Sequence, residues 1–247
     1  MALLTWWRGE RQPVLTARAD LRVTTSSNAA LVADLAQLQI AEVYRRLRDN
    51  HHPYIAWIDE EPVAYGWVAR RGASIGELRR AFEIPPGSRY LWDFATLPAW
   101  RGQGIYPRLL QAIVGRETSA ERFWIIHAPE NRASARGIEK AGFTRIGELS
   151  FLPDRQVRLA PDRLTGRATL GAALLDIPLV STAAHVALAP CWRCVISAEA
   201  GCATPMVDPQ LGSGDALSAI VLNVHSAELP YASSCGTQCT CAQLASE

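Results

Sequence analysis

Hydrophobic positions along the first 160 residues repeat with two periods, one typical of helices and one typical of strands. Over residues 29–49, apolar side chains recur at helical spacing, after polar residues that can cap a helix and with a cluster of arginines in the last turns. This pattern predicts one long helix. Short runs of β-branched and aromatic residues between turn residues predict strands at 21–25, 54–58, 63–69, 90–97, 123–127 and 143–149.

Glycines, prolines and local periodicity place the remaining elements. An acidic turn joins the strands at 54–58 and 63–69, which predicts a hairpin. The predicted order is β-α-β-β-β-α-β-α-β, and it indicates an α+β fold in which helices cover a mixed α/β sheet. The further helices are expected at 75–82, 105–114, 131–141 and 164–175.

Cysteine content divides the chain into two parts. All six cysteines lie after residue 190, so we expect a domain over residues 1–160 and a small, partly disordered, cysteine-rich extension over residues 161–247. The net charge of +1 gives no general attraction to nucleic acid or to a membrane. No stretch approaches the roughly 18 apolar residues of a membrane span, and the first residues lack the apolar core of a secretory signal. We therefore expect a cytoplasmic protein.

A loop with two glycines follows the strand predicted at 90–97 and leads into a helix. In residues 101–104 the backbone amides can converge on an anion, such as a phosphate, at the helix N-terminus. Glycine allows this because no Cβ separates the backbone from the ligand. Pro107 has no N–H, so the last usable amide of the first turn belongs to Tyr106.

This loop resembles the acetyl-CoA loop of the GNAT superfamily, which reads R/Q-x-x-G-x-G/A after the fourth strand. Arg101 and Gly104 match that pattern, whereas Tyr106 stands where the family has a small residue. Residues 131–143 resemble the second signature of the family, an asparagine-initiated helix that ends in E-K-x-G-F. Together with the element order, the resemblance covers about residues 21–160.

The resemblance implies the GNAT fold and direct transfer of an acetyl group from acetyl-CoA to a primary amine of a small molecule or peptide. Asn131 would cap its helix and help to hold the pantetheine arm. Backbone amides of the fourth strand would face the thioester carbonyl. The residues expected to bind the cofactor are Phe94, Thr96, Arg101, Gly102, Gln103, Gly104, Ile105, Tyr106, Asn131 and Ser134.

Acetyl transfer also needs residues that donate and accept protons. Many relatives place a tyrosine in the second-signature helix as the acid for the leaving thiolate, but this chain has Ile138 there, so Tyr106 or water would supply the proton. Asp93 is a candidate general base, or else a carboxylate satisfied by an arginine or a backbone amide. His51 and His52 could also accept a proton, but their expected place is a solvated helix end.

The extension offers a candidate metal site. The spacing Cys191-x-x-Cys194 lets two thiolates reach one metal ion, and Cys239 and Cys241 offer two more. One interpretation is a tetrathiolate zinc site, and another is a set of reduced thiols or disulfides. In a third, residues 226–241 resemble the Ser/Thr/Cys-rich core of a ribosomally made, modified peptide.

Two functions from different classes are consistent with the sequence. The first is an active N-acetyltransferase. The second is a non-catalytic sensor or regulatory module that binds acyl-CoA, with a tail that binds metal or a partner. The absence of a tyrosine at Ile138 favours the second, while the loop at residues 101–104 is expected in both.

Overall fold

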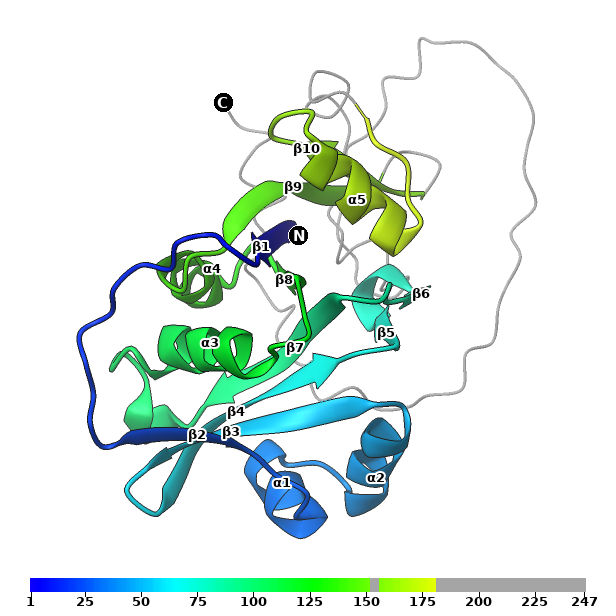
Figure 1. The fold of residues 1–247 in the computed structure, drawn as a ribbon. Helices are drawn as coiled ribbons and strands as arrows, with labels where there is room; N and C mark the ends of the chain where they lie inside the picture. Colours follow the sequence, from blue (N-terminus) through cyan, green and yellow to red (C-terminus); the bar gives the residue numbers. More distant parts are fainter. Residues whose placement is uncertain (152–155, 181–247) are drawn as a thin grey trace, which may run out of the picture. The chain divides into compact units, whose positions relative to one another are not determined.

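An eight-stranded mixed sheet organises the fold (Figure 1). The computed structural model describes residues 1–151 and 156–180. The strand order is β10-β9-β1-β8-β7-β4-β3-β2, in which only the neighbours β7 and β8 run parallel. The strands are β1 Ala2–Trp7, β2 Leu21–Thr25, β3 His51–Ile58, β4 Glu61–Ala69, β7 Ser88–Thr96, β8 Arg122–His127, β9 Thr144–Phe151 and β10 Val157–Pro161.

Helices cover both faces of this sheet. On one face, α1 (Ala29–Ala36) and α2 (Ile40–Arg48) pack over a buried cluster that includes Trp67. On the other face, α3 (Ile105–Arg116) and α4 (Arg132–Lys140) pack over a second cluster that includes Leu91. The remaining elements are α5 (Gly166–Leu175), the hairpin β5 (Gly72–Ile75) with β6 (Arg80–Glu83), and the 3-10 turns η1 (Gly76–Leu78) and η2 (Pro98–Trp100).

The predicted fold class is confirmed, but the single helix predicted over residues 29–49 is wrong. The chain leaves α1 at Gln37, whose φ is 54°, and the amide of Leu38 donates to the carbonyl of Ala33. Such a left-handed residue ends a helix. Apolar spacing continues across the break into α2, so periodicity alone does not reveal it.

The structure differs from the sequence-based prediction in two further segments. The helix predicted at 75–82 is wrong, because these residues form part of the β5–β6 hairpin around η1, with Arg79 at a φ of 48°. Strand β1 was not predicted, although it lies between β8 and β9 in the sheet. Leu3 and Leu4 are fully buried on opposite faces, so β1 lacks the alternation that marks a half-exposed strand.

Strand β10 crosses residue 160, the predicted limit of the first domain, and α5 packs on β9 and β10 just beyond it. The helix predicted at 164–175 is confirmed as α5. The division of the chain at residue 160 stays a prediction. Among the described residues, no helix combines the length and hydrophobicity needed to cross a membrane.

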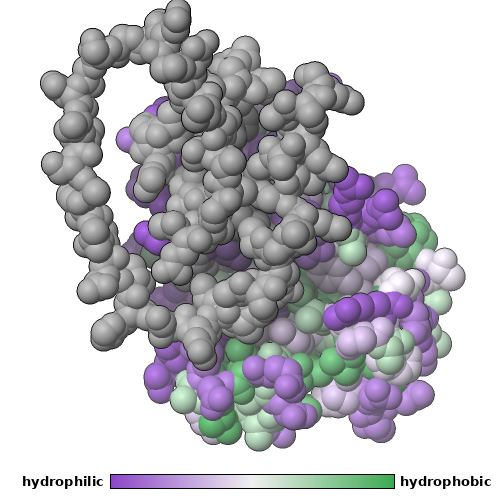
Figure 2. All heavy atoms as spheres, turned by 180° about the vertical axis from the view of Figure 1, so that it is seen from behind, coloured by the Kyte–Doolittle hydropathy of each residue, from purple (hydrophilic) through white to green (hydrophobic). Residues whose placement is uncertain are grey.

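The described surface is mixed in character. On the face seen in Figure 2, hydrophilic and hydrophobic side chains lie interspersed. Scattered apolar residues of this kind are normal for a protein surface. The large hydrophobic residues exposed in the described part are Val14, Ile40, Tyr44, Leu164 and Leu170.

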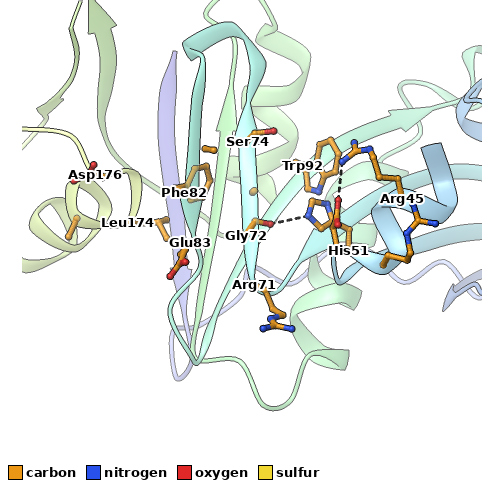
Figure 3. Close-up of a pocket in the computed structure, with 15 residues that line it drawn as sticks. Arg45, His51, Arg71, Gly72, Ser74, Phe82, Glu83, Trp92, Leu174 and Asp176 are labelled. Atoms are coloured by element: carbon orange, nitrogen blue, oxygen red, sulfur yellow. Dashed lines mark hydrogen bonds and ion pairs between the residues drawn. The ribbon is translucent and has the colours of Figure 1, made fainter. Parts of the chain in front are cut away.

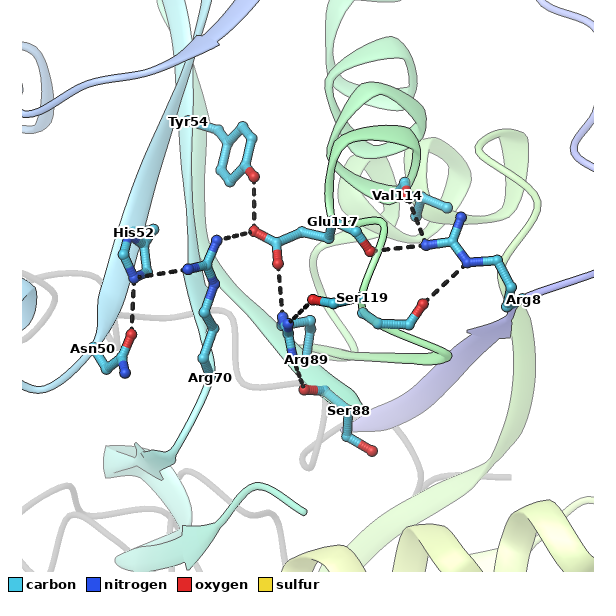
Figure 4. A network of polar contacts seen from close by, with 11 residues as sticks. Arg8, Asn50, His52, Tyr54, Arg70, Ser88, Arg89, Val114, Glu117 and Ser119 are labelled. Atoms are coloured by element: carbon cyan, nitrogen blue, oxygen red, sulfur yellow. Dashed lines mark hydrogen bonds and ion pairs between the residues drawn. The ribbon is translucent and has the colours of Figure 1, made fainter. Parts of the chain in front are cut away.

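A buried polar cluster holds the end of α3 against the sheet (Figure 4). The carboxylate of Glu117 accepts hydrogen bonds of 2.7 Å from the hydroxyl of Tyr54, from Arg70 Nη2 and from Arg89 Nε. Burial opposes ionisation of this carboxyl, but the bonds from the two arginines and the tyrosine outweigh it and lower the pKa of Glu117. The ionised carboxylate therefore links the C-terminal ends of α3 and β4 to the strands β3 and β7.

Candidate active site

The parallel strands β7 and β8 separate halfway along β7. Their register pairs Ser88 with Arg122 and ends where Leu91 meets Ile125. Beyond that point, residues 92–96 pair with β4 alone among the described strands, so their backbone groups on the β8 side have no strand partner there. We call this opening the wedge. Because backbone N–H and C=O groups need partners, a wedge of this kind can accept an extended amide-bearing ligand.

A bulge in β7 shapes the wedge. Gly66 on β4 lies opposite an extra residue of β7, and Asp93 in that bulge has a φ of 50°. A Cβ on Gly66 would lie only 1.9 Å from the ring of Phe94. Glycine at this position therefore lets the Phe94 ring turn into the core beside Tyr106, with a ring-centroid distance of 5.5 Å.

The glycine loop lies between β7 and α3, next to the wedge. Gly102 and Gly104 have φ values of +77° and +70°, a region that L side chains rarely adopt. Gly104 is the N-cap of α3, and no side chain in the described part of the chain caps the helix. Among the described residues, the first amides of the helix, those of Ile105 and Tyr106, therefore have no capping side chain, and their binding of an anion stays a prediction.

The predicted loop residues Arg101 and Gln103 are both exposed. Arg101 Nε donates to the carbonyl of Thr96 at 3.0 Å, so this arginine holds the end of β7. Gln103 accepts a hydrogen bond of 3.0 Å from Arg18, which comes from the segment between β1 and β2. Sequence reasoning missed Arg18, because nothing in the local pattern shows that this segment passes the loop.

Asn131 caps α4, as predicted. Its side-chain oxygen accepts the backbone N–H of Ser134 at 3.0 Å. Its side-chain amide nitrogen has no partner in the described part of the chain and can donate to a ligand. The hydroxyl of Ser134 lies 3.4 Å from that of Tyr106, so these three predicted residues lie together between α3 and α4.

Tyr106 occupies space that Gly137 leaves open on α4. A Cβ on Gly137 would lie 2.4 Å from Tyr106 Cδ1. Ile138, the next residue, is fully buried in the core. Burial raises the pKa of Tyr106, so its phenol stays protonated at neutral pH. Sequence reasoning missed Gly137, although a glycine inside a helix pattern is itself a sign of close packing.

Asp93 lies beside the wedge and pairs with an arginine, as one reading of the sequence proposes. Arg46 Nη1 donates to Asp93 Oδ2 at 2.5 Å, while Arg46 Nε donates to Glu42 at 2.8 Å. The guanidinium stacks on Trp92, with its carbon 4.4 Å from the ring centroid. The Asp93 side chain is 30% exposed, and Oδ1 has no hydrogen-bond partner among the described residues.

The two histidines expected at a helix end are instead part of β3, which corrects that prediction. Helix α2 ends at Arg48, and three residues later, at His51, the chain already pairs with β4. His51 is 8% exposed and His52 is half-buried. Burial lowers the pKa of both rings. A turn at Asn50, with a φ of 65°, redirects the chain from helix to strand.

The candidate zinc ligands Cys191, Cys194, Cys239 and Cys241 lie outside the described residues. Within residues 1–151 and 156–180, no three His, Cys, Asp or Glu side chains are grouped so that they could hold a metal ion.

Comparisons with known proteins give three solved acetyltransferase structures to which the chain is similar. Among solved structures, an aminoglycoside acetyltransferase, AAC(6')-Ib with coenzyme A and kanamycin, is 22% identical, with coverage of 56% of this chain and 90% of its own and a TM-score of 0.42. RimL, a ribosomal L7/L12 alpha-N-protein acetyltransferase in complex with coenzyme A, is 17% identical, with coverage of 54% and 84% and a TM-score of 0.40. A GCN5-related N-acetyltransferase from Kribbella flavida is 17% identical, with coverage of 58% and 53% and a TM-score of 0.39.

A comparison with curated proteins found no matching sequence. The model of the acetyltransferase (GNAT) family matches residues 20–143, which span β2 to the residue before β9 and include both signatures. The chain belongs to the GNAT acetyltransferase family.

Proposed function

We propose that this protein transfers the acetyl group of acetyl-CoA directly to a primary amine of a small molecule or a peptide. The observation that carries the proposal is the wedge beside the uncapped N-terminus of α3. Residues 92–96, whose backbone groups on one side have no strand partner in the described ranges, are followed along the chain by two positive-φ glycines, Gly102 and Gly104. An extended, amide-bearing arm that ends in phosphates matches both features.

The residues present fit this cosubstrate, which supplies a thioester-activated acetyl group. The amides of residues 102–106 would hold the pyrophosphate, with Arg101 beside them. The backbone of Phe94 and Thr96 would bind the pantetheine arm and the thioester carbonyl. The free amide of Asn131 and the hydroxyl of Ser134 would contact the same arm from α4.

In this proposal Tyr106 supplies a proton to the sulfur. The nitrogen–carbon bond forms as the carbon–sulfur bond breaks, so the sulfur needs a proton and the amine must lose one. The phenol of Tyr106 is protonated, comes from α3 and reaches α4 at Ser134, one turn before Ile138. A tyrosine on the neighbouring helix thus takes the place of the one that α4 lacks.

Asp93 receives the proton of the amine in this proposal, directly or through a water molecule. Among the described residues, Arg46 binds Oδ2, while Oδ1 is open to a donor. The positive φ in the bulge sets this side chain next to the wedge. Aspartate is among the few side chains that tolerate such a backbone conformation.

The alternative is a sensor that binds acyl-CoA without turnover, and the buried Ile138 favours it. To separate the two, purified protein is incubated with acetyl-CoA and a panel of amines while free thiol is measured. CoA binding is measured in parallel by calorimetry. We expect the wild type to bind CoA and to release thiol. Gly104→Glu should lose both CoA binding and thiol release, because its carboxylate repels the pyrophosphate.

Gly9→Glu is the matched control, because Gly9 also has a positive φ, of +93°, and open space around it. It carries the same chemical change and similar backbone strain outside the loop. CoA binding without thiol release on the whole panel would establish the sensor. If Gly104→Glu binds CoA as well as Gly9→Glu does, the glycine loop is not the phosphate site.

A further inference from the structure

A cavity of about 860 Å³ opens between the end of α2, the β5–β6 hairpin and α5 (Figure 3). Trp92 joins it to the wedge, because its indole lines the cavity while its backbone is the first residue of β7 beyond the β8 register. Trp92 packs with the cluster under α1 and α2. The cavity therefore approaches the wedge from the face opposite α3, and its volume suits a small ligand.

His51 fixes one wall of this cavity. Its Nε2 donates to the carbonyl of Gly72 at 2.9 Å, and its ring lies edge-on to Trp92 at 5.1 Å. Because the ring is neutral and Nε2 carries the proton, Nδ1 is an acceptor; it is buried and has no partner among the described residues. The bond to Gly72 holds β5 in place and with it the neighbouring Arg71, which also lines the cavity.

Most of the acidic groups in the cavity wall are already paired. Asp49 binds Arg45 at 3.0 Å, and Asp176 lies 3.6 Å from Arg80. These carboxylates are thus partly neutralised and attract a cationic ligand only weakly. Glu83 is the acidic lining residue that has no ion pair in the described part of the chain.

Two arginines of the wall, in contrast, have no ion pair among the described residues. Arg48 is exposed in the last turn of α2, and Arg71 is exposed beside Gly72. Among the lining residues without an ion pair in the described part of the chain, two arginines thus outnumber one glutamate, Glu83. A wall of this kind favours an anionic group and disfavours a molecule with several positive charges.

We propose that this cavity binds the acceptor, and that the acceptor is a primary amine whose carbon chain carries an anionic group such as a carboxylate. The anionic group binds Arg48 and Arg71, and the amine points towards Trp92 and the wedge. The inference rests on the proposed function, because the wedge must deliver the acetyl group. Arginine forks bind carboxylates through paired, charge-assisted hydrogen bonds.

Three probes with one four-carbon chain test this proposal on the full-length protein: 4-aminobutyrate, butylamine and 1,4-diaminobutane. Each has the same amine, and only the far end differs. We expect kcat/KM for 4-aminobutyrate to exceed that of the other two about tenfold or more. Arg48→Met and Arg71→Met should each raise KM for 4-aminobutyrate about tenfold, leave kcat within about twofold and leave butylamine unchanged.

Arg116→Met is the matched control, because Arg116 is an exposed arginine of α3 outside the cavity and the wedge. It should leave all three probes unchanged. A preference for the diamine, or equal losses on all three probes in the cavity variants, would overturn the assignment. If no probe is acetylated, the proposed function fails. Saturation-transfer NMR then tests whether 4-aminobutyrate binds in the cavity. Equal signals from the wild type and the Arg48→Met/Arg71→Met variant would reject the cavity as its binding site.

Discussion

Two carboxylates, Glu117 and Asp93, each bind arginine near β7, but their surroundings differ. Glu117 lies at the end of α3 and its side chain is 1% exposed. Both of its oxygens accept hydrogen bonds, from Tyr54 and Arg70 on one and from Arg89 on the other. Asp93 lies in the bulge with its side chain 30% exposed, and its only described hydrogen bond comes from Arg46 on Oδ2.

This difference suits Glu117 to a structural role and Asp93 to a chemical one. A buried carboxylate with every oxygen occupied has no capacity for a further ligand, so its arginines serve the fold. A carboxylate with one open oxygen at the edge of the wedge can still bind a proton or a donor. Both clusters pair an acidic side chain with arginine. Only the exposure of the carboxylate, and whether one of its oxygens lacks a hydrogen-bond partner among the described residues, indicate which cluster belongs to the site.

The largest expected effect is on stability. Glu117→Gln should lower the free energy of unfolding by about 3 kcal/mol or more, because Arg89 is left buried without a counter-charge. The matched change Asp93→Asn should cost about 1 kcal/mol or less, since asparagine tolerates the positive φ. Urea unfolding measures both. Equal losses would remove the distinction between the two carboxylates.

Two tyrosines extend the comparison from stability to catalysis. Tyr54→Phe removes a hydrogen bond to a charged group and should cost about 1.5 to 3 kcal/mol of stability, with kcat unchanged. Tyr106→Phe should leave stability within about 0.5 kcal/mol but lower kcat about 100-fold, the contribution typical of a general acid. Urea unfolding and steady-state kinetics on each variant check this pair. A Tyr106→Phe enzyme with wild-type kcat would exclude the phenol as the proton donor.

The smallest expected effect is a pH dependence that Glu117 contributes. Its pKa in the folded protein is lower than 4.5, the ordinary value for glutamate. Its stabilisation is therefore fully present above about pH 4.5 and is lost as the pH falls through the folded-state pKa. Unfolding of wild type and Glu117→Gln between pH 3 and 7 should converge towards acid. Parallel curves would show that Glu117 contributes no proton linkage.

Local sequence patterns predicted the parts of the site that depend on local structure. Gly104 ends the loop after a buried strand, and Asn131 caps a short helix, so both follow from nearest neighbours in the chain. Contacts between segments that are far apart in the chain were not predictable. An arginine partner for Asp93 was one possibility, but that this partner is Arg46, and that Tyr106 fits over Gly137, depends on segments that only the tertiary fold brings together.

The position of the first strand was equally hidden from the sequence. Strand β1 has the composition of a strand, but its neighbours β8 and β9 come more than 110 residues later. No periodicity within β1 encodes that choice of partners. The cavity, too, depends on the β5–β6 hairpin, whose residues carry a weak helical pattern and become strands through pairing with each other.

The place of β1 in the sheet also determines how long this strand waits for its partners during synthesis. Ala2 pairs with His127, so β1 leaves the ribosome long before its first partner exists. At about 5 to 20 residues per second, that delay is roughly 6 to 25 s. During this time Leu3, Leu4 and Trp6 have no sheet to cover them, which makes the nascent chain a client for chaperones that bind short apolar segments.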